Sequence, residues 1–274
     1  RATGTYDCPN HLAGFLEMVL PLGLAFTLTG RMPHVIKVGL GYGTLLMLAG
    51  IGVSLSRGGW IAMGLALIVF FGVLFLQRLY RLPALVFLLV LLVAGLGFVA
   101  KNRLSQKRFA SMFTAGKVED VRFLLWRPAI QMWQDNFWLG IGPAHFDQRF
   151  RQFRPEEMQQ RPVWVHNDYL NTLADWGAVG ALLAGSAWVL LFAGVGKTWN
   201  YVRRAPNDLS SRRSNRLALV LGAGTGLVAI LLHSVVDFNM QIPANAIVAI
   251  TLMAILTGQW RHASDKWWVR PNLI

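Results

Sequence analysis

Seven long stretches with almost no charged side chain most constrain what this chain can fold into. An α-helix needs about 20 apolar residues to cross a bilayer, and each stretch approaches that length. Backbone groups inside lipid must be hydrogen-bonded internally, which makes every span helical. We therefore predict an all-α polytopic transmembrane helical bundle with spans at 12–29, 38–55, 59–76, 82–100, 177–196, 217–236 and 242–259.

Charge is scarce inside these spans and basic outside them. Charged residues make up 14% of the chain, against about 25% in soluble domains, and Glu17 is the only Lys, Arg, Asp or Glu within a span. This argues against a soluble enzyme, a disordered chain and a nucleic-acid-binding domain. The net charge of +13 suits cytoplasmic loops and membrane lipid headgroups, so we expect lipid and no nucleic acid as a partner. The single cysteine, Cys8, excludes an intrachain disulfide.

The distribution of Lys and Arg orients the bundle. The segments 30–37, 77–81, 197–216 and 260–274 hold 13 of these residues, whereas the short segments on the opposite side hold two. Short loops rich in Lys and Arg stay in the cytoplasm. The long connection 101–176 is therefore predicted to lie outside it, in the periplasm of a Gram-negative cell.

This external connection is the expected site of chemistry. It holds eleven Lys and Arg residues, which contact either lipid headgroups or an anionic substrate whose phosphate oxygens match the arginine fork. Residues 119–135 have the spacing of an amphipathic helix that lies on the membrane surface or covers the bundle. Arg122 and Trp126 share a face of this helix, and Pro128 should kink or break it.

His166 follows in the same connection, shortly before the fifth predicted span. Histidine is the side chain best suited to acid and base catalysis near neutral pH, although a structural, hydrogen-bonded histidine would have the same spacing. Gly140, Gly142 and Pro143 predict a turn between the amphipathic helix and His166. The sequence has no zinc-site, P-loop or nucleophile-elbow motif, so we expect neither a metal nor another cofactor.

Three ionisable residues lie at membrane depth, where such groups are functional candidates. His233 and Asp237 are four residues apart at the outer end of the sixth predicted span. They either line an acceptor groove or pair with each other. Glu17 either pairs with an arginine of the site or helps hold the bundle together.

Three motifs resemble a signature of the O-antigen ligase and polymerase superfamily. The first combines Arg1–Tyr6 with Pro9–Ala13, and the second is Ser54–Trp60. The third is His166 and Asn167, followed after nine residues by Gly177 and, after two more, by Gly180. The segments Arg122–Trp126 and Leu139–Pro143 are similar to the middle of the same domain, so the resemblance covers nearly the whole chain.

This resemblance implies a type C, multi-helix glycosyltransferase of the bacterial inner membrane. The implied donor is a glycan on undecaprenyl pyrophosphate, and the implied acceptor of a ligase is lipid A core. Relatives polymerise repeat units or glycosylate proteins. Members carry more spans than the seven in this chain, which begins at Arg1 without a signal-peptide pattern. We therefore expect an N-terminally truncated fragment.

The same resemblance implies that Arg57, Arg122 and His166 are the catalytic residues. The arginines would bind the pyrophosphate and stabilise its growing charge, and His166 would orient or deprotonate the acceptor hydroxyl. Direct attack would invert the anomeric centre, and no metal ion would be needed. The predicted substrate-binding residues are Arg1, Asn10, Asn167, Trp126, His233 and Asp237.

Other classes of protein remain open. A transporter or flippase of lipid-linked sugars needs ionisable residues along its spans and usually an internal repeat. Only Glu17, His233 and Asp237 qualify, and the sequence has no evident repeat. A non-catalytic membrane scaffold is the third class. Among enzymes, an O-antigen ligase, an O-antigen or polysaccharide polymerase and a protein O-oligosaccharyltransferase share these motifs, and the acceptor separates them.

Overall fold

The computed structural model describes residues 1–113, 121–156, 158, 161–203 and 213–263. These residues form ten α-helices and one 3-10 helix, and no strand. The helices are α1 (Pro9–Thr29), α2 (His34–Ser54), α3 (Arg57–Phe75), α4 (Arg81–Lys101), α5 (Arg103–Phe113), α6 (Val121–Asp135), α7 (Phe146–Phe153), α8 (Asp168–Arg203), α9 (Asn215–His233), η1 (Asn239–Gln241) and α10 (Pro243–Ala263).

Within the described residues, six helices are long and apolar enough to cross a membrane: α1, α2, α3, α4, α8 and α9. The apolar part of α10, Pro243–Gln259, is shorter. Each of the seven predicted spans overlaps one of these helices. The prediction of an all-α polytopic bundle is confirmed, and the chain is a multi-pass membrane protein.

Helices α1 and α9 form the buried centre of the bundle. Most of their residues are buried, whereas few residues of α2, α4 and α8 are. The close approach at the centre depends on glycine, because a Cβ at Gly222 of α9 would lie 2.6 Å from the Cα of Leu22 in α1. Small residues at such crossings let helix backbones meet in lipid.

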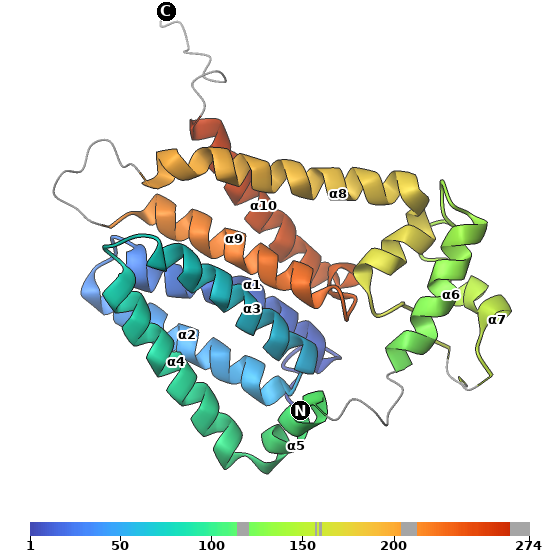
Figure 1. The fold of residues 1–274 in the computed structure, drawn as a ribbon, viewed down its shortest axis with the longest axis horizontal. Helices are drawn as coiled ribbons and strands as arrows, with labels where there is room; N and C mark the ends of the chain where they lie inside the picture. Colours follow the sequence, from blue (N-terminus) through green and yellow to red (C-terminus); the bar gives the residue numbers. More distant parts are fainter. Residues whose placement is uncertain (114–120, 157, 159–160, 204–212, 264–274) are drawn as a thin grey trace, which may run out of the picture.

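The predicted external connection is mostly helical. Helices α6 and α7 pack on the beginning of α8 around a small core that includes Leu125, Met132 and Phe146, beyond the end of the main bundle (Figure 1). Helix α6 continues through Pro128, so a break there is wrong and the alternative of a kink stays a prediction. Packing of the buried face of α6 holds the helix across the missing hydrogen bond. Residues 119–120 of the predicted amphipathic helix lie outside the described residues.

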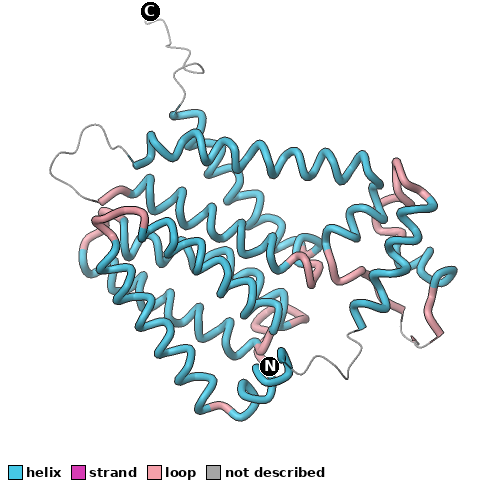
Figure 2. The backbone as a smooth tube through the Cα atoms, in the orientation of Figure 1, coloured by secondary structure: helices cyan, strands magenta, loops and turns pink. Residues whose placement is uncertain are grey.

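Several chain segments meet at one end of the bundle. Helices α1, α3, α8 and α10 begin there, and α2 and α9 end there (Figures 1 and 2). Backbone hydrogen bonds join these segments: the N–H of Ala2 donates to the carbonyl of Val53 at 3.1 Å, and the N–H of Asp168 donates to that of Ser234 at 2.9 Å. This end carries the candidate site.

Candidate functional site

His166 lies two residues before the start of α8 and has a left-handed backbone conformation, with φ of 53°. Asn167 begins the helix, because its side-chain oxygen accepts hydrogen bonds from the N–H groups of Tyr169 and Leu170, both at 3.0 Å. The imidazole ring of His166 meets Phe238 edge to face, with 4.7 Å between the ring centroids. The side-chain oxygen of Asn167 therefore caps the helix. The side-chain nitrogen takes no part in this cap.

A buried carboxylate lies behind His166. Nδ1 of His166 is 3.4 Å from Oδ1 of Asp237, whose side chain is fully buried, while the His166 side chain is 37% exposed. Burial raises the pKa of Asp237, but contact with His166, the charge of His233 and the N–H of Phe238 together lower it to about 2. An ionised carboxylate at Nδ1 orients the imidazole and leaves Nε2 as the nitrogen for a substrate.

Asp237 also joins the site to the N-terminal segment. Its Oδ2 accepts a hydrogen bond from Nδ2 of Asn10, in the first turn of α1. The Asn10 oxygen accepts one from the Arg1 guanidinium at 3.2 Å, and Arg1 Nε donates to the carbonyl of Ser54 at 3.2 Å. Four of the predicted residues, Arg1, Asn10, His166 and Asp237, therefore form one connected group. Both polar atoms of the Asn10 side chain are used inside it.

Arg57 is the first residue of α3, the helix that begins at the same end of the bundle (Figure 1). The preceding turn needs a left-handed residue, which is Leu55 with φ of 55°. Ser56 caps the helix, because its hydroxyl accepts a hydrogen bond from the N–H of Gly59 at 3.1 Å. The Arg57 charge therefore adds to the positive N-terminal end of α3, and both favour an anion.

Arg122 and Trp126 lie one turn apart on α6. Arg122 is near enough to His233 for their charges to interact, so α6 brings a second arginine towards the C-terminal end of α9. Trp126 meets Phe123 edge to face at 5.0 Å and is half-buried beside the small core of α6 and α7. Its buried Nε1 has no acceptor among the described residues.

The predicted alternative of a His233–Asp237 pair is wrong. Nδ1 of His233 lies 3.2 Å from Oε2 of Glu17, and both side chains are fully buried. The reason is the path of the chain after α9. His233 ends that helix facing α1, whereas Asp237 follows a turn and faces the beginning of α8. Among the described residues, the hydrogen-bond partner of Glu17 is therefore this imidazole and not the predicted arginine.

Two residues that help build this site, Asp168 and His11, were not among the predicted ones. Asp168 anchors the start of α8, because its Oδ2 accepts hydrogen bonds from the Ser234 hydroxyl at 2.8 Å and the N–H of Met240 at 3.0 Å. His11 packs edge to face on Phe238 at 4.9 Å, so this phenyl ring contacts two imidazoles. Each missed residue adjoins a selected one in the sequence, which was the available signal.

Helix α8 is interrupted at Gly177, whose φ is 62°. The interruption leaves backbone carbonyl groups of α8 without helical partners. N–H groups of the loop after α6 donate hydrogen bonds to them. The carbonyls of Ala174 and Asp175 accept hydrogen bonds from Ile141 at 2.9 Å and Gly142 at 3.0 Å. Gly140 and Gly142 have φ values of 68° and 98°, so the turn predicted there is confirmed. The glycine nine residues after Asn167 thus marks a bend that ties α8 to this loop.

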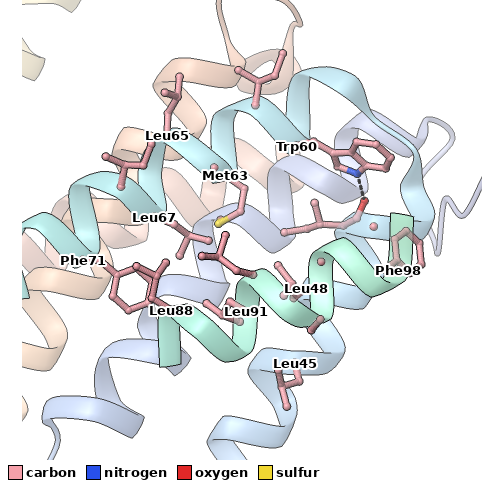
Figure 3. A pocket seen from close by; sticks show the side chains of 18 of the residues that line it. Leu45, Leu48, Trp60, Met63, Leu65, Leu67, Phe71, Leu88, Leu91 and Phe98 are labelled. Atoms are coloured by element: carbon pink, nitrogen blue, oxygen red, sulfur yellow. Dashed lines mark hydrogen bonds between the residues drawn. The ribbon is translucent and has the colours of Figure 1, made fainter. Parts of the chain in front are cut away.

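An apolar cavity of about 1100 Å³ lies between α2, α3 and α4. Figure 3 shows Trp60 and Phe98 at one end of it and Phe71 and Leu88 at the other. No ionisable side chain lines it. Trp60, one turn after Arg57, donates its indole N–H to the carbonyl of Ile51 at 3.1 Å. The cavity therefore begins beside the polar site and continues along the spans.

The described residues contain no group of three or more His, Cys, Asp or Glu side chains placed to hold a metal ion. The predicted independence from metal remains a prediction.

Comparison with known proteins gives one family. A family model described as O-antigen ligase matches residues 42–185, just over half of the chain. The matched range runs from α2 into α8 and includes Arg57, Arg122 and His166. No curated protein matches the chain.

Proposed function

Because this chain belongs to the O-antigen ligase family, we propose that it transfers a glycan from undecaprenyl pyrophosphate to lipid A core. The observation that carries the proposal is the buried Asp237 carboxylate behind the partly exposed His166, 3.4 Å from Nδ1 to Oδ1. Such a pair is suited to accept a proton from a hydroxyl group. Family membership supports a membrane protein of the ligase and polymerase kind. The donor, the acceptor and the reaction are what we propose.

The two arginines would act on the leaving group. As the glycosidic bond breaks, negative charge grows on the pyrophosphate. Fixed cationic donors aimed at that charge lower the barrier. Arg57 at the start of α3 and Arg122 on α6 approach the same end of the bundle as His166. Guanidinium forks match phosphate oxygens, so they would supply the stabilisation that a metal ion supplies in other glycosyltransferases.

His166 would act on the acceptor. Nε2 would take the proton of the attacking hydroxyl while Asp237, ionised and buried, stabilises the imidazolium that forms. The hydroxyl oxygen bonds to the anomeric carbon, and the pyrophosphate leaves from the opposite face with the bonding electrons. A single displacement of this kind inverts the anomeric centre.

The prenyl chain of the donor would lie in the apolar cavity between α2, α3 and α4. The cavity is lined by apolar side chains and starts at Trp60, one turn from Arg57. A donor with its pyrophosphate at Arg57 would then have its lipid tail along the spans. The distribution of Lys and Arg supports a site on the periplasmic side of the inner membrane.

A polymerase or a protein O-oligosaccharyltransferase would use the same donor and the same groups, with another acceptor. A flippase would need ionisable groups lining a path across the spans. Two fully buried ionisable side chains on spanning helices, Glu17 of α1 and His233 of α9, bind each other instead. This pairing favours the enzyme.

The test uses membrane vesicles containing the intact protein, supplied with undecaprenyl-pyrophosphate glycan and lipid A core. Wild type should transfer the glycan to lipid A core, and His166→Ala should lose transfer. His34→Ala is the matched control, because His34 is exposed at the opposite end of the bundle. Longer glycans on the carrier lipid would identify a polymerase. Donor left unchanged by wild type would contradict the glycosyltransferase.

A further inference from the structure

Glu17 and His233 are an ionisable pair inside the bundle that the proposed reaction does not use. Both side chains are fully buried, and their contact joins α1 to α9 through Oε2 and Nδ1 at 3.2 Å. Ionisable groups in a membrane interior are costly to bury and are usually functional. The glycines of α9 already bring these two helices together, so helix association does not require the pair.

One side of the pair packs on the residues that follow Arg57. A Cβ at Gly59 would lie 2.8 Å from Oε1 of Glu17, and a Cβ at Gly58 would lie 3.0 Å from Nε2 of His233. Both atoms are buried without a hydrogen-bond partner among the described residues. Side chains of the pair therefore touch the backbone of the first turn of α3, where any substituent larger than hydrogen would displace them.

The other side of the pair leads to Asp237. His233 is the last residue of α9, and its carbonyl accepts a hydrogen bond from the N–H of Val236 at 3.0 Å, which closes the turn before Asp237. The charge of His233 also acts on the Asp237 carboxylate. The imidazole thus belongs to the residue at which this turn begins, and the turn carries Asp237, the partner of His166.

We infer that the Glu17–His233 pair is a positioning unit, which sets Arg57 at a fixed distance from His166 by packing on Gly58 and by holding the turn before Asp237. The inference rests on the proposed function for the roles of Arg57 and His166. The pair itself touches no substrate. The hydrogen bond between its members fixes the imidazole of His233 and the side chain of Glu17, and the geometry of the pair matters more than its charge.

The kinetic test compares Glu17→Ala, Glu17→Gln and His233→Ala. Loss of the pair should lower kcat about 10- to 100-fold, because a displacement of about 1 Å has that effect on a reacting pair, with the donor KM within about threefold. Glu17→Gln keeps the length and one acceptor oxygen and should restore kcat to within about threefold of wild type. Equal loss in Glu17→Gln and Glu17→Ala would overturn the positioning role.

A double variant tests the contact with α3. Gly58→Ala should lower kcat by itself, since its methyl group meets His233 and Val236. In the His233→Ala background the contact with the imidazole is gone and only the contact with Val236 remains, so Gly58→Ala should lower kcat by a smaller factor there than in wild type. Losses that multiply in the double variant would contradict a shared action on Arg57. Thr44→Ala is the control, because Thr44 is equally buried but bonds only within α2.

A distance measurement separates this inference from the proposed function. Nitroxide labels at Ile61 on α3 and Val163 before His166, both exposed, would be placed in a Cys8→Ser background, since Cys8 is the only cysteine. Glu17→Ala should broaden or shift the distance distribution, and Glu17→Gln and Thr44→Ala should leave it as in wild type. A shift without any glycan transfer by wild type would overturn the proposed function alone. An unchanged distribution in Glu17→Ala would overturn the positioning role.

Discussion

At the scale of single residues, the site depends on one carboxylate. Asp237 accepts from Asn10, faces His166 and receives the N–H of Phe238 at 2.9 Å. Its side chain is fully buried, so the charge has no solvent to stabilise it and relies on these partners. The same arrangement that keeps Asp237 ionised keeps the imidazole of His166 oriented.

This ionisation predicts a pH dependence of stability. The pKa of Asp237 falls from 3.8 to about 2 on folding, so the unfolded state takes up the proton first as the pH drops. The stabilisation, about 2 kcal/mol, is complete above about pH 4 and is lost as the pH falls towards 2. Asp237→Asn should lower the melting temperature in detergent above pH 4. The gap to wild type should narrow below pH 4; a gap that stays constant down to pH 2 would contradict the assignment.

A substitution at Arg57 tests whether the shape of the guanidinium group matters in addition to its positive charge. Arg57→Lys keeps the positive charge but loses the planar fork that binds two phosphate oxygens. We expect transfer to fall at least about tenfold, in line with the loss of one fixed donor to a growing charge. The measurement is glycan transfer in vesicles at equal protein amounts, with the exposed Arg81→Lys as control. Near-wild-type transfer by Arg57→Lys would count against its role.

At the scale of elements, the start of α8 could not be predicted from the sequence. The apolar pattern located the span from residue 177 but not the nine residues before it, because Asp168, Asn171 and Asp175 interrupt that pattern. These polar residues are buried against the α9–α10 connection and the loop after α6. Their partners are distant in sequence, so only the tertiary structure shows that they belong inside a helix.

The bend in α8 predicts that substitution by alanine changes the stability of the protein differently at two glycines of this helix. Gly177→Ala should destabilise the protein by about 1 to 3 kcal/mol, because a Cβ there would meet the carbonyl group of Trp138 and the backbone has φ of 62°. Gly185→Ala in the same helix has open space around it and should be neutral or slightly stabilising. Thermal melting in detergent measures both. Equal melting temperatures would show that the bend is not required.

At the scale of the whole molecule, the all-α bundle could be predicted from composition and length. An apolar stretch that crosses lipid must form its backbone hydrogen bonds internally, as a helix does. The motifs indicated Arg1, Asn10 and His166, which the structure brings together with Asp237. The pairing of Glu17 with His233 could not be predicted. It depends on the rotation of α1 against α9, which glycine packing determines and which no local pattern encodes.

The orientation of the bundle is a prediction at this scale. In a Cys8→Ser background, a cysteine at Val163 should react with a membrane-impermeant maleimide in intact cells. A cysteine at His34 should react only after the cells are lysed. Both positions are exposed, and they lie at opposite ends of the bundle. The reverse pattern would place the site in the cytoplasm and contradict the reading of the Lys and Arg distribution.

The most direct test of the central claim follows one donor of known anomeric configuration through the reaction. Undecaprenyl-pyrophosphate glycan and lipid A core would be given to the intact protein in vesicles, and the new linkage would be assigned by NMR. The account predicts a glycan joined to lipid A core with inverted configuration, and no product with His166→Ala. A retained configuration, or a donor that wild type leaves unconsumed, would contradict it.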